Sequence, residues 1–403
     1  MSDHKLAHAG SIDDIIKMAR DVYGPGVIRN AAHSDFSEIA RIPTGIFVLD
    51  AQTGGGIPLG RITMIDGQEG SGKSSLCLKT VANAQRMCRK CFTFRLENIN
   101  KETGEFSASC ECNNFEPLRT VYFDSEGQFS QLWAAHMGCD PEFIYVVSVE
   151  FGEQGIDIVD AMLRSGEVNL LIVDSLAHLT PMKEIEDSAE QASVGLQARL
   201  LNKAMRKWVS AITGSQQKAI QNRTTVLMIN QMRETLVLYG DPTTNPGGKG
   251  QLYANSLHLR LRRGKAKQDA DKTRTFEVET KFLVKKSRVC PPGTTGSYEM
   301  VVTPHDGKPI GYVAEEGAIA RYAFDFGVIK DRKSDDTKLS KGAKYAFESY
   351  EFKTKKDVVE RLAVKDGFYY GLRNATISAM TGAELNVDMA LNSDSADTDG
   401  VKN

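Results

Sequence analysis

The chain has 403 residues, with 50 Lys and Arg against 52 Asp and Glu, so its formal net charge is −2. Its apolar fraction of 41% and charged fraction of 25% predict a soluble globular protein, with one large core and one or two small domains. The near-neutral balance excludes an overall basic field, so any nucleic-acid binding must come from a local patch. We expect a cytoplasmic protein, because the sequence shows neither a signal peptide's apolar stretch nor a run near the roughly 20 apolar residues of a membrane span.

Residues 11–23 carry apolar side chains at helical spacing before the Gly24-Pro25-Gly26 turn ends the pattern. They predict a short amphipathic helix, which is too small to bury its apolar face alone. The helix would pack either on the core of this chain or on a neighbouring subunit. We therefore assign residues 1–40 to an N-terminal oligomerisation helix and linker.

From residue 41 to about 303, strand-like apolar runs alternate with helical stretches, which is typical of a mostly parallel sheet covered by helices. The strand candidates are residues 62–65, 121–123, 144–149, 170–173 and 226–229, followed by an alternating pair near 257–261 and 276–284, and the long helix is 195–213. The fold class is α/β. Turn clusters then separate a small α+β C-terminal domain, 304–385, from an acidic tail, 386–403, that we expect to be disordered.

The segment from Gly67 to Ser74 has the glycine, lysine and serine spacing of a phosphate-binding loop between a strand and a helix. The glycines let successive N–H groups face one anion, and the helix adds its positive end. Lys73 would reach the β- and γ-phosphates of a nucleoside triphosphate, and Ser74 would offer a hydroxyl to Mg²⁺. The candidate nucleotide contacts are Gly67, Gln68, Glu69, Gly70, Ser71, Gly72, Lys73, Ser74 and Ser75. A glycine-rich loop without a ligand is the alternative.

Three later strand candidates end in polar residues, and the carboxyl ends of parallel strands meet at one crevice. Asp174 follows residues 170–173 and is a candidate Mg²⁺ ligand. Glu126 could orient and partly deprotonate the water that attacks the γ-phosphate, or be a surface acid. Gln231 could sense the γ-phosphate and pass its state to the Gly/Pro/Thr-rich segment behind it, or simply cap a turn.

Four of the seven cysteines form two close pairs, Cys88 with Cys91 and Cys110 with Cys112. The chain shows no export signal, so reduced thiols or metal ligands fit better than disulfides. Two such pairs are typical of a tetrahedral structural zinc site. We predict a zinc-ribbon-like insert over residues 86–119, with reduced surface cysteines as the alternative. Basic and aromatic residues in the insert leave open whether it also contacts DNA.

These motifs together resemble the bacterial and phage RecA recombinase family over roughly residues 11–390. The segments that carry the resemblance are Thr44-Gly45, Leu49-Asp50, Gly54-Gly55-Gly56, Gly67–Ser74, Asp124-Ser125-Glu126, Val173-Asp174-Ser175, Leu179-Thr180-Pro181, Glu184-Ile185-Glu186, Ala204-Met205-Arg206-Lys207, Asn230-Gln231 with Arg233, and Pro242 through Gly247-Gly248. Typical members have only a short turn where this chain has its cysteine pairs. The resemblance implies a RecA-like P-loop ATPase core.

The resemblance also implies a function: a DNA-dependent ATPase that forms a helical filament on single-stranded DNA and exchanges strands with a homologous duplex. It implies that Glu126 activates water, that Gln231 couples the γ-phosphate to the second DNA loop, and that Trp133 stacks on adenine. The two DNA loops would be about residues 182–195 and 232–250. Basic residues that the family extends to a neighbouring subunit's phosphates are matched by Lys285, Lys286 and Arg288.

The first of these loops contains one lysine and several acids, so its side chains cannot neutralise DNA phosphates. Better candidates for phosphate contacts are Arg199, Arg206, Arg233 and Lys249, and Tyr239 could stack between bases. A second basic run, Arg260, Arg262, Arg263 and Lys265, is either another DNA contact or a solvated face.

Two other functions remain open at this point. A RecA-fold branch-migration helicase or translocase can carry a four-cysteine zinc module, but places it before the nucleotide core and usually adds a protease-like C-terminal domain. A non-catalytic filament protein would bind single strands and use nucleotide only structurally. Glu126 argues against the second, and the position of the cysteines argues against the first.

Overall fold

A computed structural model describes residues 11–24, 27–28, 39–92, 115–187, 195–215, 223–234, 243–244, 248, 250–331, 339–365 and 367–382. They form two compact units, one made by the described residues up to Val313 and the other by those from Ala314 onward. Helix α1 (Ile12–Tyr23) forms where the apolar spacing predicted it. The Ser11 hydroxyl caps it by accepting a hydrogen bond from the Asp14 N–H, and Gly24 ends it with a φ of 95°.

The first unit is built on an eight-stranded sheet with the strand order β12-β11-β10-β3-β7-β6-β4-β5. Its strands are β3 (Ile62–Gly67), β4 (Thr120–Asp124), β5 (Ile144–Val147), β6 (Leu170–Asp174), β7 (Thr225–Gln231), β10 (Leu257–Gln268), β11 (Thr275–Ser287) and β12 (Thr295–Val301). Pairings from β10 through β5 are parallel, and β10, β11 and β12 pair antiparallel. Strands β3, β4 and β6 are buried along their whole length, as expected for parallel strands covered on both faces. The predicted α/β class is confirmed.

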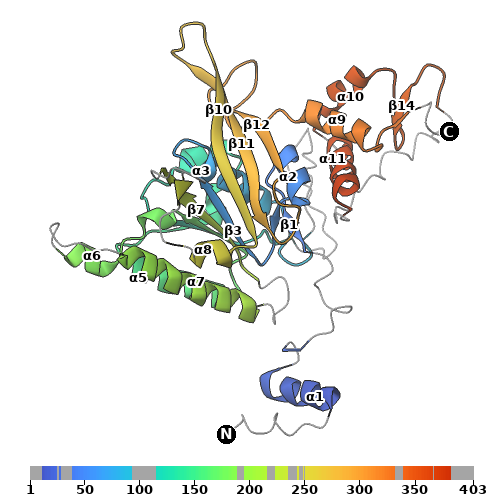
Figure 1. Cartoon of the computed structure of the whole chain (residues 1–403). Helices are drawn as coiled ribbons and strands as arrows, with labels where there is room; N and C mark the ends of the chain where they lie inside the picture. The colour runs from blue at the N-terminus through green and yellow to red at the C-terminus, as the bar shows by residue number, and fades with distance from the viewer. Residues whose placement is uncertain are drawn as a thin grey trace, which may run out of the picture. The chain divides into compact units, whose positions relative to one another are not determined.

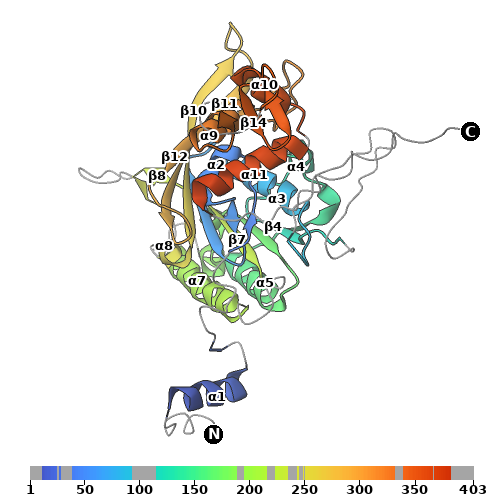
Figure 2. The ribbon, with the colours of Figure 1, turned by 90° about the vertical axis from the view of Figure 1, so that its right-hand side faces the viewer.

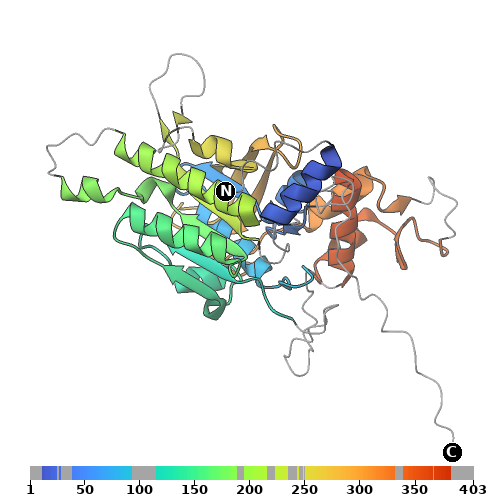
Figure 3. The same cartoon turned by 90° about the horizontal axis from the view of Figure 1, so that it is seen from below.

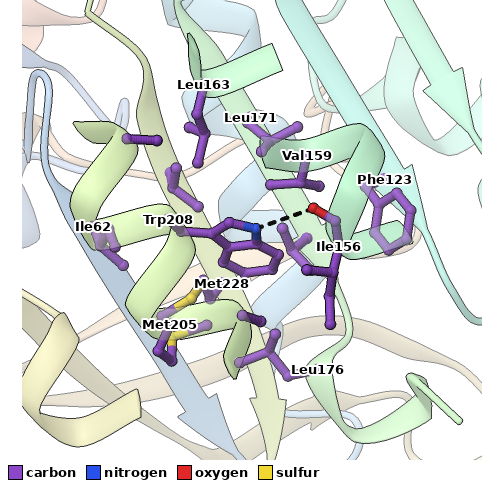
Figure 4. Close-up of a cluster of buried hydrophobic side chains, with 14 of the residues drawn as sticks. Ile62, Phe123, Ile156, Val159, Leu163, Leu171, Leu176, Met205, Trp208 and Met228 are labelled. Carbon is purple, nitrogen blue, oxygen red and sulfur yellow. Dashed lines mark hydrogen bonds between the residues drawn. The ribbon is translucent and has the colours of Figure 1, made fainter. Parts of the chain in front are cut away.

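Helices cover both faces of this sheet. Helices α5 (Gly152–Ser165) and α7 (Leu196–Ser215) lie side by side (Figures 2 and 3). Helix α3 (Lys73–Ala84) contacts β3, β6 and β7 from the other side (Figure 2). Trp208 of α7 is fully buried between α5 and the sheet (Figure 4), and its indole N–H donates to the Ile156 carbonyl at 3.4 Å. The large apolar contact of Trp208 fixes α7 on the sheet.

Shorter elements complete the first unit. They are β1 (Arg41–Ile42), α2 (Phe47–Thr53), β2 (Ile57–Pro58), α4 (Gln131–His136), α6 (Met182–Glu186), β8 (Arg233–Glu234), β9 (Thr243–Thr244) and α8 (Gly250–Ala254). Short 3₁₀ turns occupy Pro141–Phe143 and Leu176–His178. Strands β8 and β9 pair antiparallel within the segment predicted as the second DNA loop, 232–250. The long β10–β11 hairpin extends well past the neighbouring strands (Figure 1).

The second unit combines three helices with a small antiparallel sheet of order β13-β14-β15. Its elements are α9 (Glu316–Asp325), β13 (Lys330–Asp331), β14 (Tyr345–Phe347), β15 (Tyr350–Phe352), α10 (Lys355–Leu362) and α11 (Gly367–Thr381). Phe368 of α11 is the centre of its aromatic core, where the rings of Phe347, Tyr350 and Phe352 surround it. The predicted acidic tail, 386–403, lies outside the described residues.

Candidate functional site

The carboxyl ends of four parallel strands stand level at one edge of the sheet. Gly67 at the end of β3 is paired in register with Gln231 of β7, and Asp124 at the end of β4 with Asp174 of β6. The turns that follow these strands therefore open on a common space, where open α/β sheets bind their ligands.

The phosphate-binding loop has a backbone that requires glycine. A Cβ atom on Gly67 would lie 2.5 Å from the Leu261 carbonyl oxygen and 2.6 Å from the Ser71 hydroxyl. Gly70 and Gly72 have φ angles of 68° and 86°, which side-chain-bearing residues rarely adopt. The loop closes through the Ser71 hydroxyl, which donates to the Gln68 carbonyl at 2.7 Å, and it leads directly into the N-terminus of α3. This is the geometry of an anion cradle.

Lys73 is buried at the start of α3. Its Nζ donates to the carbonyl oxygens of Gly67 at 3.1 Å and Gln68 at 2.8 Å. Burial lowers the pKa of Lys73, while the nearby Asp174 and Glu126 carboxylates oppose that shift. A cation thus lies beside the loop, with the two predicted acids near it, as phosphate binding requires.

Asp174 and Ser74, the two candidate Mg²⁺ ligands, are in contact. The Ser74 hydroxyl donates to Asp174 Oδ2 at 2.7 Å, and the buried Tyr122 hydroxyl donates to the same oxygen. Burial raises the pKa of Asp174, and the hydrogen bonds from Tyr122 and Ser74 oppose this rise. One hydroxyl and one carboxylate, both hard oxygen donors, fit Mg²⁺, which keeps most of its shell as water and phosphate oxygen. The role of Tyr122 was missed, because the contact joins two strands that are far apart in the sequence.

Glu126 is held by groups at the ends of two other strands, β6 and β7. Its Oε1 accepts hydrogen bonds from Ser175 Oγ at 2.7 Å and from Gln231 Nε2 at 3.2 Å, and it lies 2.8 Å from His178 Nδ1. The Glu126 side chain is 19% exposed. The structure therefore brings Glu126 and Gln231 together. Sequence reasoning gave no role to His178, whose only signal was its position three residues after Ser175.

Trp133 lies on α4 beside the phosphate loop. Its indole N–H donates to the Ser75 hydroxyl at 3.2 Å, and the Ser130 hydroxyl caps the start of α4. The ring is half-buried next to the first turn of α3.

Lys286 and Arg288 contact the C-terminal end of α8. Lys286 Nζ donates to the carbonyl oxygens of Leu252 at 2.6 Å and Asn255 at 3.0 Å, and Arg288 Nη2 donates to that of Tyr253 at 3.4 Å. Cations at a helix C-terminus are favourable. Burial lowers the pKa of Lys286, and the nearby positive charge of Arg288 lowers it further. Lys285, the third predicted cation, is exposed.

The candidate DNA contacts are described only in part. Arg199 and Arg206 are exposed on α7. The Arg233 side chain, Tyr239 and Lys249 lie outside the described residues.

Arg260 is buried, although the sequence grouped it in a basic run that was expected to be at the surface. It is 4% exposed, and its Nε and Nη2 each lie 3.0 Å from a carboxylate oxygen of the buried Asp66. The reason is the register of β10, which pairs with β3 only as far as Leu261 opposite Gly67. Arg260 is covered by β3, whereas Arg262 and the residues after it extend beyond the end of that strand. Arg260 therefore stabilises the strand that leads into the phosphate loop.

Two of the four predicted zinc ligands lie within the described residues, and two lie outside them. Cys88 is buried and forms an antiparallel bridge with Pro117, and Cys91 is half-buried. Cys110 and Cys112 lie outside the described residues. Within the described ranges, no group of three or more His, Cys, Asp or Glu could hold a metal ion.

Comparison with known proteins identifies the family. The sequence matches the family model described as RecA N-terminal domain over residues 10–98 and 94–304. It is 34% identical over 310 residues to protein RecA of Nautilia profundicola, covering 76% of each chain. With protein RecA of Aquifex aeolicus it shares 31% identity over 304 residues, covering 75% of this chain and 76% of the relative. The chain belongs to the RecA family. It is a RecA-type recombination protein and, with its family, a DNA-dependent ATPase that uses ATP and Mg²⁺.

Family membership also implies DNA binding and filament formation. A solved structure of the RadB recombinase covers 64% of this chain and 96% of that chain at 17% identity, with a TM-score of 0.42. In the part of the chain that is described, no helix has the length and apolar character needed to cross a membrane.

Proposed function

We propose that this RecA family member polymerises on single-stranded DNA with ATP, pairs that strand with a homologous duplex and promotes strand exchange. One observation carries this function: Glu126 Oε1 accepts a hydrogen bond from Gln231 at 3.2 Å, and Gln231 ends the strand that leads into the segment between β8 and β9. The candidate base and the root of a candidate DNA loop are thus in direct contact, which would make hydrolysis respond to DNA.

Within this function, each residue at the strand ends has a separate role. Lys73 and the loop N–H groups bind the phosphates, and Ser74 with Asp174 would hold Mg²⁺, which neutralises phosphate charge when bound. Glu126 orients the attacking water and takes its proton as the bond to the γ-phosphorus forms and the bond to the departing ADP oxygen breaks. Trp133 is proposed to stack on the adenine.

Assembly would complete the site. Lys286 and Arg288, with Lys285 beside them, are proposed to reach the phosphates bound by a neighbouring subunit, so that hydrolysis depends on the filament. Helix α1 carries exposed Ile12, Ile15 and Val22, and we propose that this apolar face packs on the neighbour.

Exposed arginines of α7 are proposed to contact DNA phosphates. Arg199 and Arg206 are seven residues apart, so they lie on one face of the helix. Replacing both by Ala should weaken binding to all sequences and lower the slope of log affinity against log salt by about one for each arginine replaced. Arg164→Ala is the matched control, because Arg164 is an exposed arginine of α5 already paired with Asp160. If the DNA affinity of the unaltered protein does not change with salt concentration, the proposed phosphate contacts are wrong.

We propose that Cys88, Cys91, Cys110 and Cys112 hold a structural zinc ion. The ends of the insert are joined, since the Arg89 N–H donates to the Glu116 carbonyl at 2.7 Å and the Leu118 N–H to that of Met87 at 3.1 Å. In sequence, the second pair stands close before Phe115, where the described chain resumes. Metal analysis of the purified protein should find one zinc per chain, and replacing Cys88 and Cys91 by Ser should release it. A metal-free, unaltered protein would refute the site.

Strand exchange between a circular single strand and a homologous linear duplex tests the proposed function. The protein should exchange strands with ATP, while Glu126→Gln should bind ATP and DNA but lose about a hundredfold or more in hydrolysis. A non-hydrolysable analogue should support filaments visible by electron microscopy. Directional unwinding without homology would instead indicate the helicase, and unchanged hydrolysis by Glu126→Gln would reject the assigned base.

A further inference from the structure

We propose that His178 is a positioning residue for Glu126, through which the first predicted DNA loop acts on the catalytic base. The inference rests on the proposed function, because it takes Glu126 as the base and residues 182–195 as a DNA loop. His178 Nδ1 lies 2.8 Å from Glu126 Oε1 and 3.0 Å from Ser175 Oγ. Gln231 reaches the same oxygen from the root of the second loop.

The hydrogen positions in this cluster are constrained. An ionised carboxylate only accepts hydrogen bonds, and the single hydroxyl hydrogen of Ser175 is directed to Glu126 Oε1. Nδ1 must therefore carry a hydrogen for its short contact with Oε1 to be attractive. The three donors then converge on Oε1. With Oε1 engaged by three donors, we assign the proton of the attacking water to Oε2, so the imidazole positions the base rather than taking the proton.

The backbone around His178 is tied to both ends of the predicted first loop. His178 ends a 3₁₀ turn four residues before Met182, where α6 begins. Gln197, at the start of α7 just after the loop, donates from Nε2 to the Ala177 carbonyl at 2.7 Å. A change at the C-terminal end of the loop would thus be transmitted to this turn through Gln197. The imidazole is 45% exposed, so it has room to respond, whereas the Glu126 side chain is 19% exposed.

The chain between the turn and the loop is also anchored on α5. The Thr180 carbonyl accepts a hydrogen bond from the Gly152 N–H at 2.7 Å, and Glu153 Oε2 accepts one from the Met182 N–H at 2.9 Å. The N-terminus of α5 therefore holds the segment between His178 and the loop. A rearrangement of the loop would then reach the turn that carries His178 from the C-terminal end of the loop, where Gln197 holds the Ala177 carbonyl.

Steady-state ATPase assays of the full-length protein, with and without single-stranded DNA, test the proposal. His178→Ala should lower the DNA-stimulated kcat about tenfold and leave the KM for ATP within about twofold, because the imidazole orients the base but does not hold nucleotide. The ratio of stimulated to DNA-free turnover should fall as well. His178→Asn should recover to within about threefold of the unaltered protein, since an amide nitrogen can donate from the Nδ1 position.

His305→Ala is the matched control, because His305 Nε2 makes the same kind of contact with another glutamate, Glu277, at 2.6 Å. It should leave kcat and the stimulation ratio unchanged. An unaltered ratio in His178→Ala, a His178→Asn variant as impaired as His178→Ala, or an equal loss in His305→Ala would overturn the role of His178. If instead DNA does not stimulate the unaltered protein, or Glu126→Gln stays active, the proposed function itself is wrong.

Discussion

Asp174 and Glu126 are carboxylates at the ends of adjacent parallel strands, yet their surroundings differ. Asp174 is held by the hydroxyls of Ser74 and Tyr122, which belong to α3 and to the buried strand β4. Glu126 is held by Ser175, His178 and Gln231, which all stand where a strand gives way to a loop. One acid is fixed by the core of the fold, and the other by the roots of its loops.

The difference separates two tasks that a nucleotide switch must combine. A metal ligand has to be in place before nucleotide arrives, and partners on a helix and a buried strand provide this, although burial makes the charge of Asp174 unfavourable. A regulated base has to respond to a distant ligand, and it can do so only if its hydrogen-bond partners belong to segments that move. In this protein the ends of two neighbouring strands, β6 and β4, supply both the fixed metal ligand and the regulated base.

Asp174→Asn should have the largest effect and should change activity and stability in opposite directions. ATP hydrolysis should fall about a thousandfold, because the Mg²⁺ ligand is lost. The raised pKa of Asp174 means that the folded state holds its proton more tightly than the unfolded chain, so its ionisation opposes folding above that pKa. The nucleotide-free variant should therefore melt higher at pH 7, by about 2 °C. The gain should shrink as pH falls through the raised pKa and the carboxyl becomes neutral.

Asp157→Asn is a control of opposite sign. Asp157 is an exposed acid whose pKa is lowered by its hydrogen bond from Lys207 at 2.6 Å, so its ionised form favours folding. Its replacement should not raise the melting temperature at any pH. A drop in the melting temperature of metal-free Asp174→Asn would show that Asp174 is a structural acid and would remove one side of the comparison.

Tyr122→Phe should have an intermediate effect, confined to metal use. The Tyr122 hydroxyl donates to Asp174 Oδ2, and its loss leaves the ionised carboxylate with one donor fewer. Groups behind a metal ligand typically change metal affinity 10–100-fold, so the Mg²⁺ concentration for half-maximal ATPase should rise about tenfold. The kcat at saturating Mg²⁺ should stay within about threefold.

Tyr145→Phe is the matched control for this hydroxyl. Tyr145 stands on the neighbouring strand β5 and is 66% exposed, so its loss should not alter the Mg²⁺ requirement. Equal Mg²⁺ requirements in Tyr122→Phe and in the unaltered protein would mean that Asp174 needs no support from the sheet.

Local sequence was sufficient for the phosphate loop and for most strands. Gly67, Gly70 and Gly72 encode the loop because each supplies a backbone that another residue could not adopt there. The convergence of Asp174, Glu126 and Gln231 was also predictable, since parallel strands bring their carboxyl ends to one edge. These features depend on short segments and on one general rule of sheet geometry.

Contacts between segments distant in sequence were not predictable, because they depend on strand register. In the sequence, Tyr122 cannot be distinguished from the other apolar residues of its strand. Only the pairing of β4 with β6 shows that its hydroxyl meets Asp174. Arg260 and Arg262 look alike in the sequence, and only the end of β3 opposite Leu261 makes one buried and the other exposed. His178 became a candidate only when the turn after β6 was seen beside Glu126.

Replacing the two serines beside Glu126 should have the smallest effects. One replacement should change activity and the other stability. Ser175 Oγ donates to Glu126, whereas Ser125 Oγ donates to the Ser175 carbonyl at 2.7 Å and accepts from its N–H at 2.8 Å. Ser175→Ala should lower the DNA-stimulated kcat about threefold, since two donors still hold the base. Ser125→Ala should lower the free energy of unfolding by about 1 kcal/mol, since it breaks a link between strand ends. Chemical denaturation and ATPase assays of both variants decide the matter: if Ser175→Ala alters only stability, the hydroxyl belongs to the fold and not to the base.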